Sequence, residues 1–266
     1  MADFTAKDVQ ALRQATGAGM MDAKKALTES DGDMEAARKL LREKGLAKAD
    51  DRAGRENAQG AIAIATDVGT VGLVELKCET DFVAKSDNFI RLTQELADSV
   101  AARGEGGVAS HATAIDDLRV SLKENIEVGR VVQLKLGEGE IVDTYLHRQD
   151  GRGVNGVVVV LQGGSIELAH DIAVHVAFAK PPYLSRDEVP EEVVAEERET
   201  LLAITKAEGK PEAAWSRIVD GRLDGWYKER VLLDQAFVRD DKQTVAQLAA
   251  SGGATIVRVA QLYIGG

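Results

Sequence analysis

The sequence predicts an α+β fold, with an N-terminal three-helix module, a duplicated hairpin-plus-helix core with antiparallel sheets, and a projecting antiparallel helical hairpin. Three observations predict it. Residues 5–46 have apolar residues at helical spacing between short turns, residues 61–77 alternate in the manner of strands, and residues 187–230 return to helical spacing around one break. A chain of 266 residues has room for roughly two domains with buried cores.

Residues 1–47 form the predicted three-helix module. Thr5 with Asp8 three residues later is the pattern of a helix N-cap, and Thr16-Gly17-Ala18-Gly19 is expected to end the first helix. The turn Ser30-Asp31-Gly32-Asp33 precedes the third helix, which Gly45 is expected to end. The apolar residues at helical spacing in the first and third helices are Val9, Leu12, Ala15, Met34, Ala37, Leu40 and Leu41.

The second helix of the module begins with two adjacent methionines, Met20 and Met21. Adjacent residues on a helix point roughly 100° apart, so both can hardly be buried together. We expect one of them to fill the core of the module. The other is then free to serve a polarizable surface that faces a partner.

The core begins with a predicted β-hairpin. Residues 61–66 and 70–77 alternate on either side of Asp67-Val68-Gly69, and Ser86 is then expected to cap a helix that contains the run Phe89 to Val100. A second set of extended and helical segments repeats this plan, which indicates an internal duplication. These segments are 116–125, 130–136, 140–147, 156–161 and 165–178.

The helical hairpin has its arms at 187–207 and 212–230, with a break between them. Arms of this length resemble a short antiparallel coiled coil, which we expect to depend on the core for its stability. The residues expected to meet between the arms are Val194, Leu201 and Ile204 on one side and Trp215, Ile218, Val219 and Leu223 on the other. The predicted segments of the chain are a module at 1–47, a linker at 48–60, core subdomains at 61–128 and 129–184, the hairpin at 185–230 and a closing segment at 231–266.

The charge balance favours a protein or small-molecule partner. Lys and Arg number 33 against 44 Asp and Glu, which gives a net charge of −11, and the acids are spread along the chain. A field of this sign repels nucleic acid and anionic membranes, so we expect no direct contact with either. The single Cys78 excludes an intramolecular disulfide. With no leader pattern and no long apolar run, the sequence predicts a soluble, cytoplasmic protein.

Three sequence patterns resemble a zinc site, a dinucleotide-binding motif and a nucleophilic cysteine, but none of them meets the requirements of that site. His170 and His175 are five residues apart on one predicted helix, roughly 140° around the axis, which does not suit a shared zinc ion. The glycines of 151–156 satisfy a dinucleotide-binding spacing, but a run of valines follows where a helix is needed, so a hairpin turn is predicted. Cys78 has no base nearby in the sequence. We predict no enzyme, cofactor or metal site, unless folding assembles one from distant residues.

The candidate binding stretch is Thr80-Asp81-Phe82-Val83, which follows a predicted strand within Lys77 to Lys85. Two interpretations are open. In the first, Asp81 forms a turn and Phe82 is an ordinary core aromatic. In the second, a loop between rigid elements holds Phe82 out from the surface as a binding residue. The stretch itself does not decide between them.

Several motifs together resemble bacterial elongation factor Ts. They are Leu12-Arg13, Thr16 to Asp22, Lys24 to Leu27, Thr80 to Ala84, Ile218 to Leu223 and Leu233 to Val238, in the family's order along nearly the whole chain. Ala23 is a departure, because many members carry cysteine there. The resemblance implies a first domain similar to ubiquitin-associated domains.

The resemblance also implies a function and a set of contact residues. It implies a guanine-nucleotide exchange factor that binds the GTPase elongation factor Tu, with Thr80, Asp81, Phe82 and Val83 disturbing the magnesium and phosphate site. It further implies that Met20, Met21, Lys24, His147 and Val238 touch the GTPase, although simple packing or a solvated charge explains each of them as well. The rival is an adaptor outside translation, in which the three-helix module binds a ubiquitin-like or helical partner.

Overall fold

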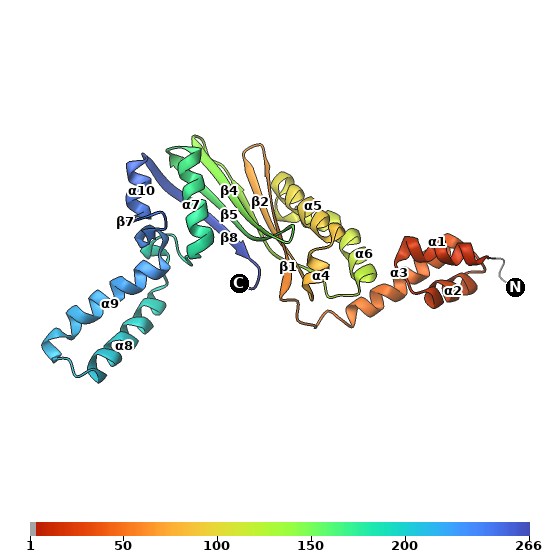
Figure 1. Ribbon diagram of the computed structural model, residues 1–266, viewed down its shortest axis with the longest axis horizontal. Coiled ribbons are helices and arrows are strands. Elements are labelled where there is room, and N and C mark those ends of the chain that lie inside the picture. The colour runs from red at the N-terminus through yellow and green to blue at the C-terminus, as the bar shows by residue number, and fades with distance from the viewer. Residues whose placement is uncertain (1–3) are drawn as a thin grey trace. The chain divides into compact units, whose positions relative to one another are not determined.

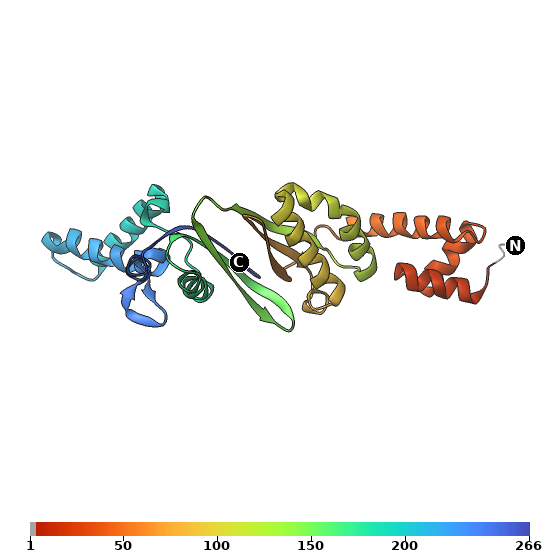
Figure 2. The same cartoon turned by 90° about the horizontal axis from the view of Figure 1, so that it is seen from above.

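The computed structural model describes residues 4–266 (Figures 1 and 2). It divides into two compact units. Unit 1 holds the chain up to Lys135 together with Leu146–Gly156 and Leu262–Gly266, and unit 2 holds Leu136–Tyr145 and Val157–Gln261. The predicted α+β class with an N-terminal three-helix module and antiparallel strands is confirmed. The finer segment boundaries stay a prediction.

The module consists of α1 (Ala6–Thr16), α2 (Met20–Glu29) and α3 (Met34–Asp50). Thr5 and Asp8 form the predicted capping box, and Gly17 ends α1 with a left-handed φ of 67°. The small core is built from Val9, Leu12, Ala23, Ala26, Leu27, Ala37 and Leu41. The prediction for Ala15 is wrong, because that side chain is exposed.

Gly45 does not end α3, which continues to Asp50 inside the predicted linker. A Cβ atom on Gly45 would lie 2.5 Å from a methyl group of Val120 on α6 (Ala112–Leu122). The glycine is therefore explained by the close approach of two helices. Sequence spacing alone cannot distinguish this use of glycine from a helix stop.

The sheet of unit 1 places β2 (Thr70–Cys78) between β1 (Gln59–Asp67) and β3 (Glu127–Lys135), all antiparallel. The start of β5 (Arg152–Gly163) pairs with the edge of β1 that faces away from β2. The helix α5 (Asp87–Arg103) buries its apolar stripe in the same core, followed by η1 (Glu105–His111) and α6. The strand β3 was predicted to belong to the second half of the duplication, but it pairs along β2.

The strands β4 (Glu140–Gln149) and β8 (Ala254–Tyr263) lie mostly in unit 2, and both pair with β5. The helix α7 (Ile166–Ala179) shares a core with the buried valines of β5. The remaining elements are η4 (Leu232–Asp234), β6 (Ala236–Phe237), β7 (Asp240–Thr244) and α10 (Val245–Ser251). The glycine-rich stretch at 151–156 makes the predicted hairpin turn, with positive φ at Asp150 and Gly151, and then enters β5.

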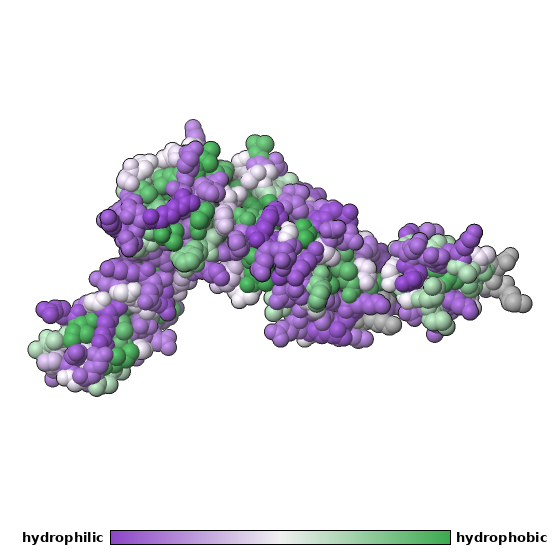
Figure 3. Space-filling model, viewed as in Figure 1, coloured by the Kyte–Doolittle hydropathy of each residue, from purple (hydrophilic) through white to green (hydrophobic). Residues whose placement is uncertain are grey.

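The predicted helical hairpin is present as η2 (Arg186–Glu188), α8 (Glu191–Ala207), η3 (Glu212–Ala214) and α9 (Trp215–Arg230). Leu223 and Trp226 are buried at the base of the hairpin, where Val194 and Leu201 pack against them. The prediction for Ile204 is wrong, because its side chain is exposed and Thr205 is buried instead. On the face seen in Figure 3, hydrophilic and hydrophobic residues are interspersed over the hairpin. No helix in the described part of the chain is long and apolar enough to cross a membrane.

Candidate functional site

The predicted binding stretch folds as a single helical turn, α4 (Asp81–Ala84), where a loop was expected. Thr80 is its N-cap, and the Thr80 hydroxyl accepts a hydrogen bond from the Val83 N–H at 3.3 Å. Ser86 occupies the N-cap position of α5 as predicted, but its hydroxyl donates to the Val83 carbonyl at 2.8 Å and caps no amide of α5. A short helix in place of a loop holds the side chains of the stretch in fixed directions.

Phe82 projects from this helical turn, with 82% of the residue exposed. Val83 packs partly against the core of unit 1, and Ala84 is fully buried, so these two residues hold α4 to the unit. The interpretation of Phe82 as a core aromatic is therefore wrong. Exposure alone does not mark a binding residue, because Phe178 is 77% exposed as well; what distinguishes Phe82 is its place beside the Asp81 carboxylate on α4.

Asp81 is held in an ion pair. The ammonium group of Lys85 lies 2.7 Å from the Asp81 carboxylate and 3.2 Å from the carboxylate of Asp150, in the turn between β4 and β5. The hydrogen bond from Lys85 holds the pKa of Asp81 below its usual range, so Asp81 stays charged at neutral pH. The pair also links α4 to a turn that lies far from it in the sequence. Nothing in the sequence pattern pointed to this role of Lys85.

Met20 and Met21 are 49% and 74% exposed at the start of α2. The core of the module is filled by Ala23, Ala26 and Leu27, so the prediction that one methionine fills it is wrong. Lys24, one turn further along the same helix, is exposed as well. Small core residues let the helices approach closely and leave no volume for a methionine. The start of α2 thus presents two thioether side chains and a cation.

His147 and Val238 lie on separate elements. His147 is exposed near the end of β4, three residues before Asp150, and belongs to unit 1. Val238 is exposed in the turn between β6 and β7 of unit 2, and its N–H donates to Nδ1 of His175 at 3.2 Å. Because Nδ1 accepts this hydrogen bond, the ring proton of neutral His175 is assigned to Nε2. Nε2 then donates to the Gln235 side-chain oxygen at 2.9 Å.

His175 is expected to make the stability of unit 2 depend on pH. Burial lowers the pKa of His175 below its usual value, so below about pH 6.5 the unfolded chain binds a proton that the folded chain does not. The free energy of unfolding should therefore fall as the pH is lowered below that value. Thermal unfolding midpoints measured over a pH series should fall less steeply in a His175→Gln variant. Equal slopes in the two proteins would contradict the expectation.

Cys78 is expected to be unreactive in the folded protein. Burial, helped by the negative charge of Glu124, raises the pKa of the thiol to about 12. Because the thiolate is the reactive form, very few molecules are reactive at pH 8. An aromatic disulfide reagent should label the native protein slowly and the protein in urea quickly. Equal labelling rates would show that Cys78 is accessible.

The histidines do not converge on a common site. Nδ1 of His170 lies 2.8 Å from Asp143, whereas His175 on the same helix faces Gln235. Nε2 of His111 lies 2.6 Å from the hydroxyl of Ser99 in unit 1. Within residues 4–266, no three His, Cys, Asp or Glu side chains are grouped closely enough to hold a metal ion.

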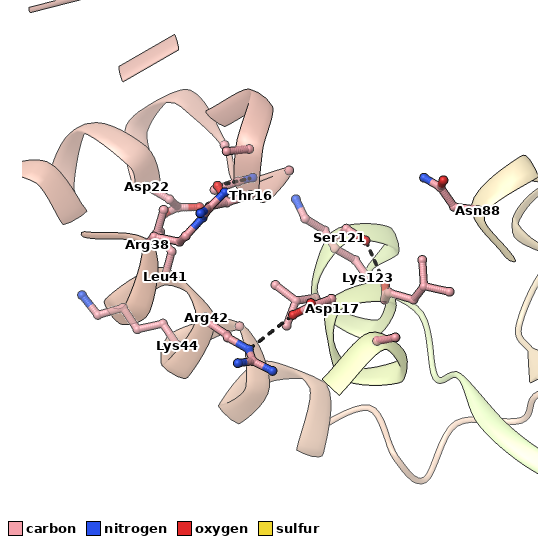
Figure 4. Close-up of a pocket in the computed structure, with 18 of the residues that line it drawn as sticks. Thr16, Asp22, Arg38, Leu41, Arg42, Lys44, Asn88, Asp117, Ser121 and Lys123 are labelled. Atoms are coloured by element: carbon pink, nitrogen blue, oxygen red, sulfur yellow. Dashed lines mark hydrogen bonds and ion pairs between the residues drawn. The ribbon is translucent and has the colours of Figure 1, made fainter. Parts of the chain in front are cut away.

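A pocket of about 1370 Å³ in unit 1 lies apart from the binding stretch, between the three-helix module and α5 and α6 (Figure 4). Its lining contains more cations than carboxylates and forms a local basic surface, which the net negative charge of the sequence does not indicate. Neighbouring acids offset part of this charge: Arg42 pairs with Asp117 at 3.3 Å, and Arg91 with Glu95 at 3.7 Å. None of Thr80 to Val83 lines this pocket, and the absence of a nucleic-acid partner stays a prediction.

Comparison with known proteins identifies the family. A family model described as "Elongation factor TS" matches residues 79–266. The chain is 43% identical over 280 residues to elongation factor Ts of Paenarthrobacter aurescens (strain TC1), and 43% over 287 residues to that of Micrococcus luteus. It is 42% identical over 277 residues to elongation factor Ts of Clavibacter michiganensis subsp. michiganensis. Each of these three alignments covers the full length of this chain and of the relative. This chain therefore belongs to the elongation factor Ts family.

Proposed function

We propose that this protein is a guanine-nucleotide exchange factor that binds elongation factor Tu with GDP and promotes release of the GDP, so that GTP can bind during translation elongation. Membership of the family supports the general role. The single observation that supports a role for α4 is the projection of Phe82 beside a charged Asp81. The protein carries out no chemical step in this proposal.

The mechanism must couple two binding equilibria. An exchange factor promotes release only if it binds the nucleotide-free GTPase more tightly than the nucleotide-bound form, and the nucleotide then weakens binding of the factor by the same ratio. Phosphate groups and a bound Mg²⁺ carry much of the interaction energy of a nucleoside diphosphate. Displacing the elements that hold the metal is therefore an effective way to couple the two sites.

Phe82 and Asp81 suit this task in different ways. An exposed phenyl ring that becomes buried between two helices of the GTPase contributes about 1.5 to 3 kcal/mol, which is available to shift those helices. The Asp81 carboxylate can compete for the polar groups that surround the metal ion. Thr80 and Val83 act in this proposal from within unit 1, as the N-cap of α4 and as its packing contact.

We further propose that Met20, Met21 and Lys24 contact the nucleotide-binding domain of the GTPase. The exposure of both methionines supports this, because flexible thioether side chains adapt to a partner surface. His147 and Val238 are proposed as additional contacts, since each is exposed. A pull-down would identify a partner other than the GTPase if the three-helix module were instead that of an adaptor.

The deciding experiment is release of a fluorescent GDP analogue from elongation factor Tu. The protein is added at substoichiometric amounts, with excess unlabelled GDP. Acceleration with multiple turnovers is expected, because a factor that is released by the incoming nucleotide acts repeatedly. No acceleration with the GTPase of the same cell would refute the proposed function.

A further inference from the structure

The helix α4 is too short to be stable by its own hydrogen bonds. It contains four residues, and isolated helices shorter than about 12 residues are marginal in water. Phe82 is mostly exposed and so contributes little packing that could fix its own position. The direction in which Phe82 projects therefore depends on the packing of Val83 and Ala84 and on the contacts that other residues make with the ends of α4.

Glu124 makes three such contacts at the start of the motif. One carboxylate oxygen accepts hydrogen bonds from the N–H groups of Glu79 and Thr80, at 3.0 and 3.1 Å. The other accepts from the Thr80 hydroxyl at 2.5 Å. Hydrogen bonds to an ionised carboxylate are about twice as strong as those between neutral groups.

The bond to the Thr80 hydroxyl has a consequence for the helix cap. The donated hydrogen bond to Glu124 fixes the rotation of this hydroxyl so that a lone pair of its oxygen faces Val83, and the oxygen accepts a hydrogen bond from the Val83 N–H at 3.3 Å. Glu124 therefore orients the group that caps α4. A continuous chain of hydrogen bonds runs from Glu124 through Thr80 to the backbone of the turn that carries Phe82.

Glu124 is itself held in place. It follows Lys123, which ends α6 with a left-handed φ of 60°, and it precedes the buried Asn125. The side-chain amide of Asn125 donates to the carbonyl of Arg55 at 2.8 Å, and the backbone N–H of Asn125 donates to the Glu79 carboxylate at 2.6 Å. The two chain segments thus exchange hydrogen bonds in both directions, which fixes the carboxylate of Glu124 relative to the start of α4.

We propose that Glu124 is a positioning residue for nucleotide exchange, which holds α4 in the conformation that presents Phe82 to the GTPase. The inference rests on the proposed function and adds a residue that acts through Thr80 without touching the partner. Removing Glu124 should let α4 unfold locally in the free protein. Only the fraction of molecules with α4 formed would then bind productively, so the apparent affinity falls while the rate at saturation stays the same.

The test compares Glu124→Ala with Glu124→Gln, and with Glu105→Ala, which removes an exposed carboxylate from η1. In Glu124→Ala, the amide protons of Thr80, Val83 and Ala84 should lose protection from hydrogen exchange, while those of β1 and β2 keep it. The factor concentration that gives half-maximal GDP release should rise by up to about tenfold, the limit set by a lost cap and its neighbouring hydrogen bonds, with the maximal rate unchanged. Glu124→Gln keeps one acceptor oxygen, which can retain the bonds from the N–H groups of Glu79 and Thr80, but it loses the charge and the second acceptor, so both properties should lie between those of Glu124→Ala and the wild-type protein.

Other results would overturn the proposal. Unchanged protection of α4 in Glu124→Ala would show that Glu124 does not hold it. Loss of protection throughout β1 and β2 would show a general role in stability, and a lower maximal rate at unchanged half-saturation would place Glu124 in contact with the partner. If the wild-type protein does not accelerate GDP release, the proposed function fails, and with it the positioning role in exchange, whereas the protection data still report separately whether Glu124 holds α4.

Discussion

A Phe82→Ala variant is expected to accelerate GDP release about 10 to 100 times less effectively than the wild-type protein, with an unchanged thermal unfolding midpoint. The ring is 82% exposed in the free protein, so its loss removes almost no packing from unit 1. Its burial against the GTPase would contribute about 1.5 to 3 kcal/mol, which corresponds to a change in rate of this size. The measurement is release of a fluorescent GDP analogue over a range of factor concentrations, together with a thermal melt.

A matched control is Val68→Ala in the turn between β1 and β2. Val68 is 96% exposed and apolar, and it has no part in the proposed contact. This variant should exchange nucleotide as the wild-type protein does. If Phe82→Ala lowers the unfolding midpoint in proportion to its loss of activity, or if Val68→Ala is equally impaired, Phe82 is not the specific contact proposed here.

A Phe89→Ala variant is expected to lose about 3 to 5 kcal/mol of unfolding free energy, the usual cost of removing a fully buried phenylalanine. Phe89 lies seven residues after Phe82, on α5, and is fully buried in the core of unit 1. The cavity left by the ring cannot be filled without moving α5 against the sheet. Urea unfolding measured by circular dichroism gives the change directly.

Phe89→Leu provides the control, because it retains much of the buried volume and should lose less stability than Phe89→Ala. At a temperature where the Phe89→Ala protein remains folded, it should still accelerate GDP release, since Phe82 and its supports are unchanged. A loss below about 1 kcal/mol would show that the core around Phe89 is loosely packed. The two phenylalanines are thus expected to separate function from stability within one short stretch.

Local features were predictable because they depend on neighbouring residues. The capping box of Thr5 and Asp8, the turn at Asp150 and Gly151 and the end of α1 at Gly17 all follow from the backbone preferences and hydrogen-bonding groups of a few adjacent residues. The apolar runs that became β1, β2, α5 and α7 were also found, because burial on one or both faces imposes a regular spacing.

The errors occurred where a distant segment determined the outcome. Gly45 was taken as a helix end, but it permits the approach of Val120, 75 positions later in the chain. Met20 and Met21 were divided between core and surface, but the alanines of α2 already fill the space within the module. The strand β3 was assigned to the second half of the duplication, but it pairs with β2. This pairing depends on the register of two segments, which neither segment encodes by itself.

The same distinction applies to the functional site. The sequence by itself determined the family resemblance, the motif Thr80 to Val83 and the strand before it, because these are contiguous residues. It left open whether Phe82 is a core residue or a surface residue, because a phenylalanine in the sequence is compatible with either position. Only the tertiary structure decided this, by capping α4 with Thr80, burying Ala84 and linking Glu124 to the start of the motif across 44 residues. Burial and long-range hydrogen bonds depend on which segments meet in space, and that information is absent from any short stretch of the chain.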